Sequence, residues 1–312
     1  MLVFISRRLA IEPSSVLGPG IQVDLFDGEL LPREELLRHA HTASGLVATL
    51  GERIDDELLD AAPRLRIVAN HAVGTDNIDV AACTRRGIWV TNTPDVVTEA
   101  TADLTWALIL AVTRRLREGE RLIREGRFHG WTPTMLLGRE LRGGTLGIFG
   151  YGRIGRAVAR RAEGFGLRVL FTSRTGGVSL DDLLAQSDIL SIHAPLTAGT
   201  RHAIGPVQLL QMKRGSYLIN TSRGPLVDEA ALVRALELGH LAGAGLDVYE
   251  DEPRVHPGLP GRDDVVLLPH LGTATQETRA QMATLALTDV ERVLRGERPL
   301  HPVNDLGASG PA

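Results

Sequence analysis

Short runs of apolar residues recur along the chain from its first residues onward. Most runs span four or five positions and are followed by polar or glycine-containing residues, which is the pattern of strands buried in a parallel sheet. Helical patterns separate several of these runs, and strands that alternate with helices predict parallel β–α units. In the first part of the chain, the pattern predicts strands at residues 2–5, 21–25, 45–49, 65–69 and 88–91, and a helix at 54–62.

The pattern changes after residue 95. A nearly continuous apolar face predicts a long helix over residues 98–116, with Asp95 or Thr98 as its N-cap. Residues 127–144 show no clear periodicity, and so long a segment without regular structure is usually functional or a subunit contact. Beyond it, the pattern predicts strands at residues 146–149, 168–172, 189–192, 216–220, 242–248 and 265–268, and helices at 228–237 and 276–295.

These elements predict an α/β fold class with two Rossmann-like domains, each built on a doubly wound parallel sheet. The helix at residues 276–295 is long enough to return the chain to the first domain. Of the 312 residues, 43% are hydrophobic and 23% are charged, which is typical of a globular enzyme and excludes a disordered chain.

Charge and cysteine content narrow the function classes. The net charge is −4 and the basic residues are spread along the sequence, so we expect no nucleic-acid or membrane partner. Cys83 is the sole cysteine, which excludes a disulfide framework and a cysteine-based metal site, and we predict no metal. The apolar run at residues 2–5 is too short for a signal peptide, and no run is long enough to span a membrane. We therefore expect a cytoplasmic protein.

A glycine-rich turn follows the predicted strand at residues 146–149. The turn is Gly150-x-Gly152-x-x-Gly155, and an amphipathic helix comes after it. Strand, glycine turn and helix in this order form the dinucleotide-binding fingerprint. Gly150 allows a tight turn, Gly152 allows the backbone to approach a pyrophosphate, and Gly155 allows the helix to lie close to the strand. The start of that helix offers N–H groups to the phosphates.

The end of the next predicted strand bears on the choice of cofactor. Enzymes that use NADH generally have Asp or Glu there, which binds the ribose hydroxyls. This chain has Ser173-Arg174-Thr175 instead, and no carboxylate until Asp181. A guanidinium flanked by two hydroxyls can bind a 2′-phosphate through charge-assisted hydrogen bonds. We therefore expect NADPH to be the preferred cofactor and NADH the alternative. An exposed arginine that merely follows the strand is the competing explanation.

Three residues that could carry chemistry follow later strands of the same predicted sheet, where ligands of open α/β sheets bind. They are Arg223, Glu252 and His270. A guanidinium can hold a carboxylate and polarise the carbonyl beside it, and an imidazolium can donate a proton to that carbonyl. A carboxylate next to the histidine would orient its ring and favour the protonated form. Each residue alone has an ordinary structural explanation, but the three together beside a cofactor turn favour reduction of a 2-ketoacid.

The same residues lie within longer motifs. The motifs are Asn220-Thr-Ser-Arg-Gly-Pro-Leu-Val-Asp-Glu229, Gly245-Leu-Asp-Val-Tyr-Glu-Asp-Glu-Pro253 and Pro269-His-Leu-Gly272. They resemble signatures of the D-isomer-specific 2-hydroxyacid dehydrogenases, and the resemblance covers nearly the whole chain. It implies that Arg223 is the substrate-binding arginine and that Glu252 and His270 are the acid–base pair.

The resemblance also implies further ligand contacts. Residues 72–79 resemble the family's substrate loop, in which backbone N–H groups of Val73 and Gly74 would hold the substrate carboxylate. Asp247 would lie on the carboxamide side of the nicotinamide. The predicted cofactor contacts are Gly150, Tyr151, Gly152, Arg153, Ile154, Gly155, Ser173, Arg174, Thr175, Pro195, Thr221, Ser222, Asp247 and Gly272.

The domain organisation and assembly follow from the same resemblance. It implies a substrate domain of residues 1–95 plus 276–312, a dinucleotide-binding domain of residues 96–275, and a homodimer. Within the family, residues 130–138 are similar to the glyoxylate/hydroxypyruvate reductases, in which a tryptophan reaches the partner subunit's substrate pocket. Trp131 is the matching position, and an interface anchor is its alternative role.

The segment at residues 175–179 is shorter than is usual in the family, so we expect a peripheral strand or helix beside the adenine to be missing. The sequence thus predicts a reductase of small 2-ketoacids that resembles glyoxylate/hydroxypyruvate reductases most. A broad D-2-hydroxyacid or phosphoglycerate-type dehydrogenase is the enzymatic alternative. A nucleotide-sensing binding protein on the same scaffold is the alternative from another class. The physiological ketoacid and the direction of the reaction stay open.

Overall fold

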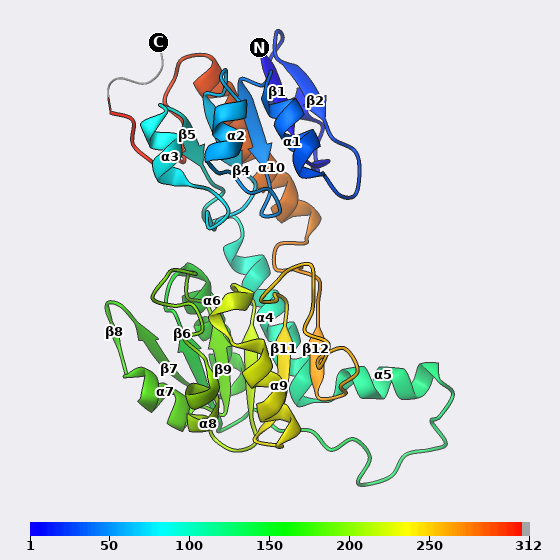
Figure 1. Cartoon of the computed structure of the whole chain (residues 1–312). Coiled ribbons are helices and arrows are strands. Elements are labelled where there is room, and N and C mark those ends of the chain that lie inside the picture. The colour runs from blue at the N-terminus through cyan, green and yellow to red at the C-terminus, as the bar shows by residue number, and fades with distance from the viewer. Residues whose placement is uncertain (308–312) are drawn as a thin grey trace. The chain divides into compact units, whose positions relative to one another are not determined.

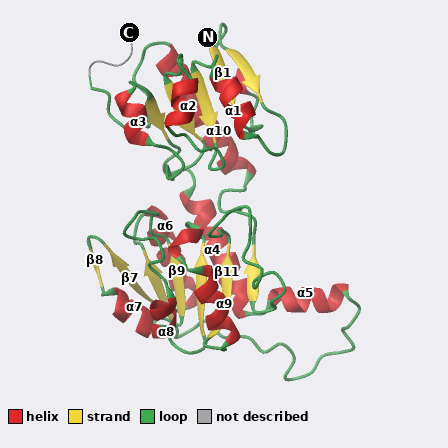
Figure 2. Ribbon diagram, in the orientation of Figure 1, coloured by secondary structure: helices red, strands yellow, loops and turns green. Residues whose placement is uncertain are grey.

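The computed structural model describes residues 1–307. The chain folds into two compact units, one formed by Met1–Val97 and the segment that begins at Ala274, the other by Thr98–Thr273. Each unit has one central, mostly parallel sheet with helices on its faces (Figures 1 and 2). The predicted fold class, two Rossmann-like α/β units, is therefore confirmed. No helix within residues 1–307 is long and apolar enough to span a membrane.

The first unit is built on a five-stranded sheet in which every pairing is parallel, in the order β2-β1-β3-β4-β5. Three of its strands, β3, β4 and β5, are buried along their whole length, as expected for a sheet covered on both faces. The strands are β1 (Leu2–Ile5), β2 (Gln22–Leu25), β3 (Gly45–Ala48), β4 (Ile67–Asn70) and β5 (Trp89–Thr91).

Helices cover both faces of this first sheet. On one face, α1 (Arg33–Ala40), α2 (Asp56–Ala61) and α3 (Val80–Arg85) contribute to one hydrophobic core. On the other face lies α10 (Gln276–Leu294), whose Leu287 and Val290 pack on side chains of β1, β3 and β4. The C-terminal helix thus completes the first unit. A short 3₁₀ helix, η1, spans Pro13–Ser15.

The second unit is built on a seven-stranded sheet in the order β12-β11-β10-β9-β6-β7-β8. All pairings are parallel except that of β7 with β8. The chain runs from β6 outward to β7 and then returns to the other side of β6 with β9, so the order reverses between β6 and β9. The strands are β6 (Thr145–Phe149), β7 (Arg168–Ser173), β8 (Gly176–Gly177), β9 (Ile189–Ile192), β10 (Ser216–Asn220), β11 (Leu241–Leu246) and β12 (Val265–Leu267).

Helices also cover both faces of the second sheet. One face packs on α4 (Thr98–Thr113) and α6 (Arg153–Ala162). The other packs on α7 (Leu180–Gln186), α8 (Pro206–Gln211) and α9 (Glu229–Glu237). The remaining elements are α5 (Leu116–Arg124) and the 3₁₀ helices η2 (Glu163–Phe165) and η3 (Gly224–Leu226).

The structure corrects the helix predicted at residues 98–116. It ends at Thr113, and Arg115 adopts a left-handed conformation with φ 53°, after which α5 begins in a new direction. Helix α5 has no buried residue and extends away from the sheet of its unit (Figure 1). Residues 127–144 contain no helix or strand, as the missing periodicity indicated. The apolar pattern did not indicate α1, α3, α5 or α8.

Candidate active site

The glycine turn after β6 lies where the strand order of the second sheet reverses. This is the place where open α/β sheets bind ligands. Gly150 has φ 99°, and a Cβ atom there would lie 2.4 Å from the backbone nitrogen of Ala194, which follows β9. Only glycine fits such a turn, because a side chain would clash with the neighbouring backbone.

The other two glycines of the fingerprint have opposite surroundings. A Cβ at Gly155 would lie 2.2 Å from the carbonyl oxygen of Gly150, so the packing of α6 on the turn requires a glycine there. A Cβ at Gly152 would meet no atom within 4 Å, and its φ of −78° is open to any residue. Gly152 is also the N-cap of α6 and provides no side-chain cap. The protein itself therefore does not explain Gly152, whereas a ligand next to the helix start would.

The shortened segment after Arg174 forms part of a short β7–β8 hairpin. Ser173 Oγ donates to the Gly176 carbonyl over 3.0 Å and accepts the N–H of Thr175 over 3.3 Å, which closes the turn. Gly177 has φ 103°, and a Cβ there would lie 2.1 Å from the Phe171 carbonyl. This segment contains a two-residue edge strand, β8, which pairs with β7. Arg174 is exposed at the tip and has no hydrogen bond or ion pair within residues 1–307.

The turn after β10 carries three predicted site residues, Thr221, Ser222 and Arg223, and is stabilised by hydrogen bonds of its own side chains. Asn220 accepts the N–H of Ser222 over 3.0 Å and donates to the Arg223 carbonyl over 2.9 Å. Ser222 Oγ donates to the Ala194 carbonyl over 2.6 Å, so the turn is attached to the segment after β9. Thr221 is buried and its hydroxyl lies 2.9 Å from that of Thr105 on α4.

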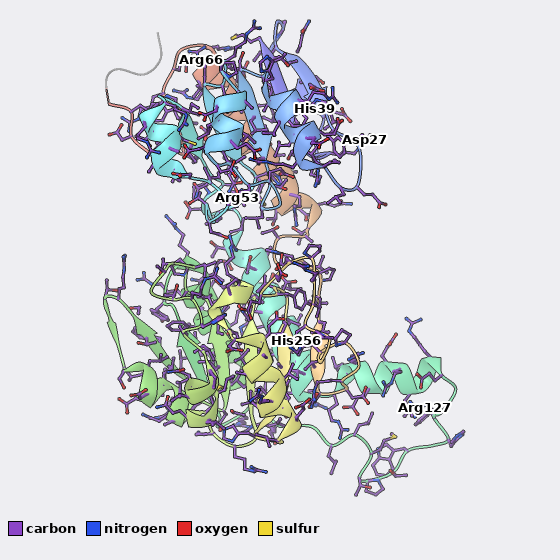
Figure 3. All side chains as sticks on the ribbon, viewed as in Figure 1. Asp27, His39, Arg53, Arg66, Arg127 and His256 are labelled. Atoms are coloured by element: carbon purple, nitrogen blue, oxygen red, sulfur yellow. The ribbon has the colours of Figure 1, made fainter. Side chains whose placement is uncertain are left out.

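Arg223 is brought toward the loop after β11 by a close contact between backbones. A Cβ at Gly224 would lie only 1.8 Å from the carbonyl carbon and oxygen of Tyr249. Two carboxylates reinforce this contact, because Glu229 accepts the N–H of Glu250 over 2.6 Å and Glu250 accepts the N–H of Glu229 over 3.2 Å. Glu229 also accepts the N–H of His256, which lies further along the same loop (Figure 3).

His270 and Glu252 form a direct pair. Nδ1 of His270 lies 3.0 Å from Oε2 of Glu252, and Oε1 of Glu252 accepts the N–H of Tyr249 over 3.0 Å. Burial alone would raise the pKa of the Glu252 carboxyl. The hydrogen bond and charge of His270, with the nearby charge of Arg223, outweigh burial and hold this pKa below its usual range. The carboxylate is therefore ionised at neutral pH. Nε2 of His270 has no hydrogen-bond partner within residues 1–307.

Asp247 fixes the turn that carries His270. Its side chain is fully buried at the end of β11, and its two oxygens accept the N–H groups of Leu271 over 2.6 Å and Gly272 over 2.8 Å. The Asp247 carbonyl accepts the N–H of His270 over 2.9 Å. Burial raises the pKa of the Asp247 carboxyl, although these N–H groups and the charge of His270 act against it. His270 itself has φ 57°, an unfavourable conformation that the hydrogen bonds of Asp247 to the neighbouring backbone maintain.

The second unit thus brings together most of the predicted residues. Arg223, Glu252, His270, Asp247 and the glycine turn lie at the carboxyl ends of strands of one sheet. Val73 and Gly74 belong to the first unit, after β4. Trp131 lies in the irregular segment after α5, and its side chain is 75% exposed. Within residues 1–307, no group of three His, Cys, Asp or Glu residues could hold a metal ion.

Sequence reasoning missed two residues of this region. Glu229 looked like an ordinary acidic residue at a helix start, and only its contacts with the distant loop reveal its role. His193 follows β9, and its Nε2 lies 2.8 Å from Ser191 Oγ. Burial lowers the pKa of His193 to about 3, so the ring is neutral near pH 7. Its position directly after a strand, two residues before Pro195, was the available signal.

Comparison with known proteins gives one consistent result. Residues 106–272 match the model of the D-isomer specific 2-hydroxyacid dehydrogenase, NAD binding domain. A glyoxylate reductase from Aeropyrum pernix is 48% identical over 320 residues, which cover 97% of this chain and 95% of that protein. The chain belongs to the D-isomer-specific 2-hydroxyacid dehydrogenase family. The matched residues 106–272 include Arg223, Glu252 and His270.

Solved structures agree with membership of this dehydrogenase family. A crystal structure of a protein from Thermus thermophilus has a TM-score of 0.90 and 44% identity, and covers 97% of this chain and 100% of that chain. An NADPH-dependent glyoxylate/hydroxypyruvate reductase from Sinorhizobium meliloti, solved with NADP and malonate, has a TM-score of 0.84 and 36% identity. That match covers 98% of this chain and 97% of that chain.

The glycine turn of this dehydrogenase fits a dinucleotide. Gly150 and Gly155 are needed for packing within the protein, while the position of a Cβ at Gly152 is open beside the N-terminus of α6. Pyrophosphate is the group that binds helix N-termini in dinucleotide folds. The turn and α6 are therefore the residues that would hold it.

The two glycines predict opposite outcomes of the same substitution. Gly155→Ala should lower the melting temperature, because its Cβ would lie 2.2 Å from the Gly150 carbonyl oxygen. Gly152→Ala should leave the melting temperature unchanged but weaken NADPH binding, since its Cβ enters the space expected for the pyrophosphate. Thermal unfolding and titration of NADPH fluorescence would measure the two effects. Unchanged NADPH affinity in a folded Gly152→Ala variant would contradict the placement of the pyrophosphate.

Proposed function

We propose that this chain is a cytoplasmic, homodimeric reductase that converts glyoxylate and hydroxypyruvate to the 2-hydroxy acids, with NADPH preferred over NADH. The observation that carries the proposal is the pairing of His270 with Glu252, within reach of the charge of Arg223, at the carboxyl edge of the nucleotide-binding sheet. The Aeropyrum relative is named a glyoxylate reductase. The Sinorhizobium protein is described as an NADPH-dependent glyoxylate/hydroxypyruvate reductase. Both descriptions support the substrate class.

Arg223 holds the substrate in this proposal. Its guanidinium can donate two parallel hydrogen bonds to a carboxylate or to a carboxylate oxygen and the adjacent carbonyl. The contact between Gly224 and Tyr249 fixes the backbone from which the guanidinium extends. The backbone N–H groups of Val73 and Gly74 are the further donors that we propose for the substrate carboxylate.

His270 supplies the proton. Glu252 accepts the Nδ1–H of His270, so the protonated ring keeps its Nε2–H for the carbonyl oxygen of the substrate. The ionised Glu252 carboxylate fixes the orientation of the His270 ring through this hydrogen bond. The bound nicotinamide supplies the hydride. Asp247 holds the turn that carries His270 and faces, in this proposal, the carboxamide side of the nicotinamide.

Substitutions of His270 and Arg223 should change the kinetic constants in different ways. His270→Gln should lower kcat by about 10²–10⁴-fold while NADPH binding stays intact, because it removes the proton donor alone. Arg223→Ala should raise KM for glyoxylate, because the guanidinium holds the carboxylate, and should also lower kcat, because the guanidinium polarises the carbonyl in the transition state. Steady-state kinetics and NADPH titration would separate the effects, and near-normal kcat in His270→Gln would remove it from the mechanism.

A substrate panel tests the proposed function itself. The unmodified chain should reduce glyoxylate and hydroxypyruvate with higher kcat/KM than pyruvate or phosphohydroxypyruvate, measured by nicotinamide absorbance. Faster turnover of another ketoacid would favour the broad or phosphoglycerate-type dehydrogenase. Cofactor binding without turnover of any ketoacid would favour the nucleotide-sensing protein.

Cofactor preference rests on Arg174. Its guanidinium lies at the tip of the β7–β8 hairpin without a protein partner among residues 1–307, between the hydroxyl residues Ser173 and Thr175. A charge-assisted bond to a 2′-phosphate should favour NADPH by about ten- to a hundredfold. Arg174→Ala should weaken the binding of NADPH and leave the binding of NADH little changed. Added salt should reduce the difference in kcat/KM between the two cofactors. Equal kcat/KM for both cofactors at low salt in the unmodified enzyme would refute this preference.

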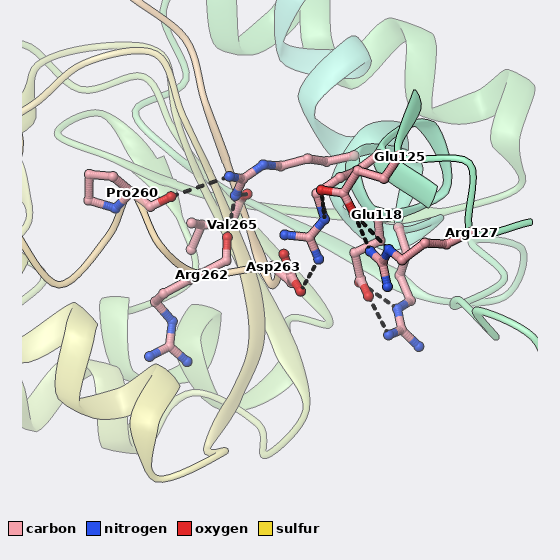
Figure 4. Close-up of polar contacts among 10 residues, drawn as sticks. Glu118, Glu125, Arg127, Pro260, Arg262, Asp263 and Val265 are labelled. Carbon is pink, nitrogen blue, oxygen red and sulfur yellow. Dashed lines mark hydrogen bonds and ion pairs between the residues drawn. The ribbon is translucent and has the colours of Figure 1, made fainter. Parts of the chain in front are cut away.

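The homodimer proposal rests on α5 and the segment after it. Arg117 donates to the carbonyls of Pro260, Arg262 and Val265, and Arg121 pairs with Asp263 over 2.6 Å (Figure 4). These bonds anchor the helix on its own unit. Large apolar side chains beyond the anchor are exposed, a feature of surfaces that bind another chain. They are Ile123, Phe128, Trp131 and Leu137.

We propose that Trp131 enters the substrate pocket of the partner subunit. Trp131→Ala should raise KM for glyoxylate or shift selectivity toward bulkier ketoacids while the dimer persists. Leu137→Ala, on the same segment and also exposed, is the matched control and should leave selectivity unchanged. Sedimentation, which measures the oligomeric state, and the substrate panel together distinguish the two roles of Trp131. A monomeric Trp131→Ala variant with unchanged selectivity would instead indicate an interface anchor.

A further inference from the structure

Three consecutive carbonyls in the loop after β4 are each bound by a neighbouring residue. The Ala72 carbonyl accepts the backbone N–H of Thr93 over 3.0 Å. The Val73 carbonyl accepts the side-chain amide of Asn92 over 2.8 Å, and the Gly74 carbonyl accepts that of Asn70 over 2.7 Å. Such a run of bound carbonyls outside regular structure fixes the orientation of three successive peptide units.

The orientation of the carbonyls determines where the amide hydrogens point. The peptide bonds of this loop are trans, and in a trans peptide the C=O and the following N–H point in opposite directions. The N–H groups of Val73, Gly74 and Thr75 therefore point away from the residues that bind the carbonyls. None of the three has an acceptor within residues 1–307. Successive N–H groups in a turn can form an anion-binding concavity.

The side chains that bind the carbonyls are themselves held. Asn70 is fully buried at the end of β4, and its Oδ1 lies 3.4 Å from Nδ2 of Asn77, which leaves the Asn70 amide hydrogens for Gly74. Asn77 also donates to the carbonyls of Thr49 and Glu52 over 2.9 and 3.0 Å. The loop is thus tied at both ends to the carboxyl edge of the first sheet.

We infer that Asn70 and Asn92 are positioning residues for substrate binding, and that Thr75 provides a third N–H donor beside Val73 and Gly74. The inference rests on the proposed function, in which this loop binds the ketoacid carboxylate. The two amides hold the carbonyl dipoles away from the anion and turn the N–H dipoles toward it. Without these amides, the carbonyls of Val73 and Gly74, which repel a carboxylate, are no longer held turned away from it.

The effect should appear in substrate binding more than in turnover. The carboxylate is present in both ground state and transition state, so its loss of contacts raises KM with little change of kcat. A residue that only stabilised the fold would lower the melting temperature and leave the KM of the folded enzyme unchanged. This difference separates positioning from general stability.

The test uses near-isosteric substitutions that remove the donor. Asn92→Leu and Asn70→Leu should each raise KM for glyoxylate, and Kd for the probe oxalate, by about five- to tenfold. Asn304→Leu is the matched control, because Asn304 is a buried asparagine of the same unit that bonds to Val90, Ile88 and Thr84 but not to this loop. It should lower the melting temperature without changing either constant.

A second measurement observes the donors directly and does not depend on whether Asn70→Leu folds. Oxalate added to the ¹⁵N-labelled, unmodified chain should shift the amide resonances of Val73, Gly74 and Thr75. If the Thr75 resonance stays in place while those of Val73 and Gly74 shift, the inference that Thr75 provides a third N–H donor is overturned.

The outcomes separate this inference from the proposed function. If the unmodified chain reduces glyoxylate and Asn92→Leu keeps its KM and its Kd for oxalate, the inference is overturned and the function stands. If the unmodified chain fails to reduce glyoxylate, the function is wrong. Oxalate binding that weakens in Asn92→Leu then still supports the oriented loop, whereas absent oxalate binding overturns it.

Discussion

The buried carboxylate of Asp247 makes the hydrogen bonds on which the candidate active site of the second unit depends. A carboxylate without access to water is costly unless its oxygens accept hydrogen bonds, and Asp247 meets this need with the N–H groups of Leu271 and Gly272. The backbone must therefore turn at His270, which adopts a left-handed conformation that a non-glycine residue rarely takes. That turn presents the imidazole to Glu252.

The other half of the edge is built by contacts between backbones. Gly224 lies so close to Tyr249 that no side chain fits, and the reciprocal bonds of Glu229 and Glu250 hold the two turns together. Arg223 and Glu252 extend from the two turns joined in this way. The side chains of the candidate site are thus held by contacts within the protein, which would reduce the cost of organising them for the proposed reaction.

In the proposed function, the first unit would contact the substrate carboxylate by another physical route. Three peptide dipoles of the loop after β4 are oriented by hydrogen bonds to their carbonyls. The second unit thus places charged side chains at the carboxyl edge of its sheet, and the first unit places oriented amides in the loop after β4.

Sequence reasoning was most successful where a pattern is local. The alternation of strands and helices predicts the fold, and the spacing Gly150-x-Gly152-x-x-Gly155 predicts a nucleotide turn, because each depends on residues close in the chain. The break at Arg115 was not predictable, since the apolar face of α4 ends without a proline or glycine to mark it. The role of Glu229 and the bound carbonyls after β4 were also hidden, because their partners are distant in sequence.

The central claim is that His270 and Glu252 act as one unit in the reduction of a ketoacid. It is tested most directly by a double-mutant cycle on kcat/KM for glyoxylate with NADPH, using His270→Gln, Glu252→Gln and the double variant. The account predicts that Glu252→Gln slows the unmodified enzyme but has little further effect once His270 is replaced. Losses that multiply in the double variant would show that the two residues act independently and would contradict the account.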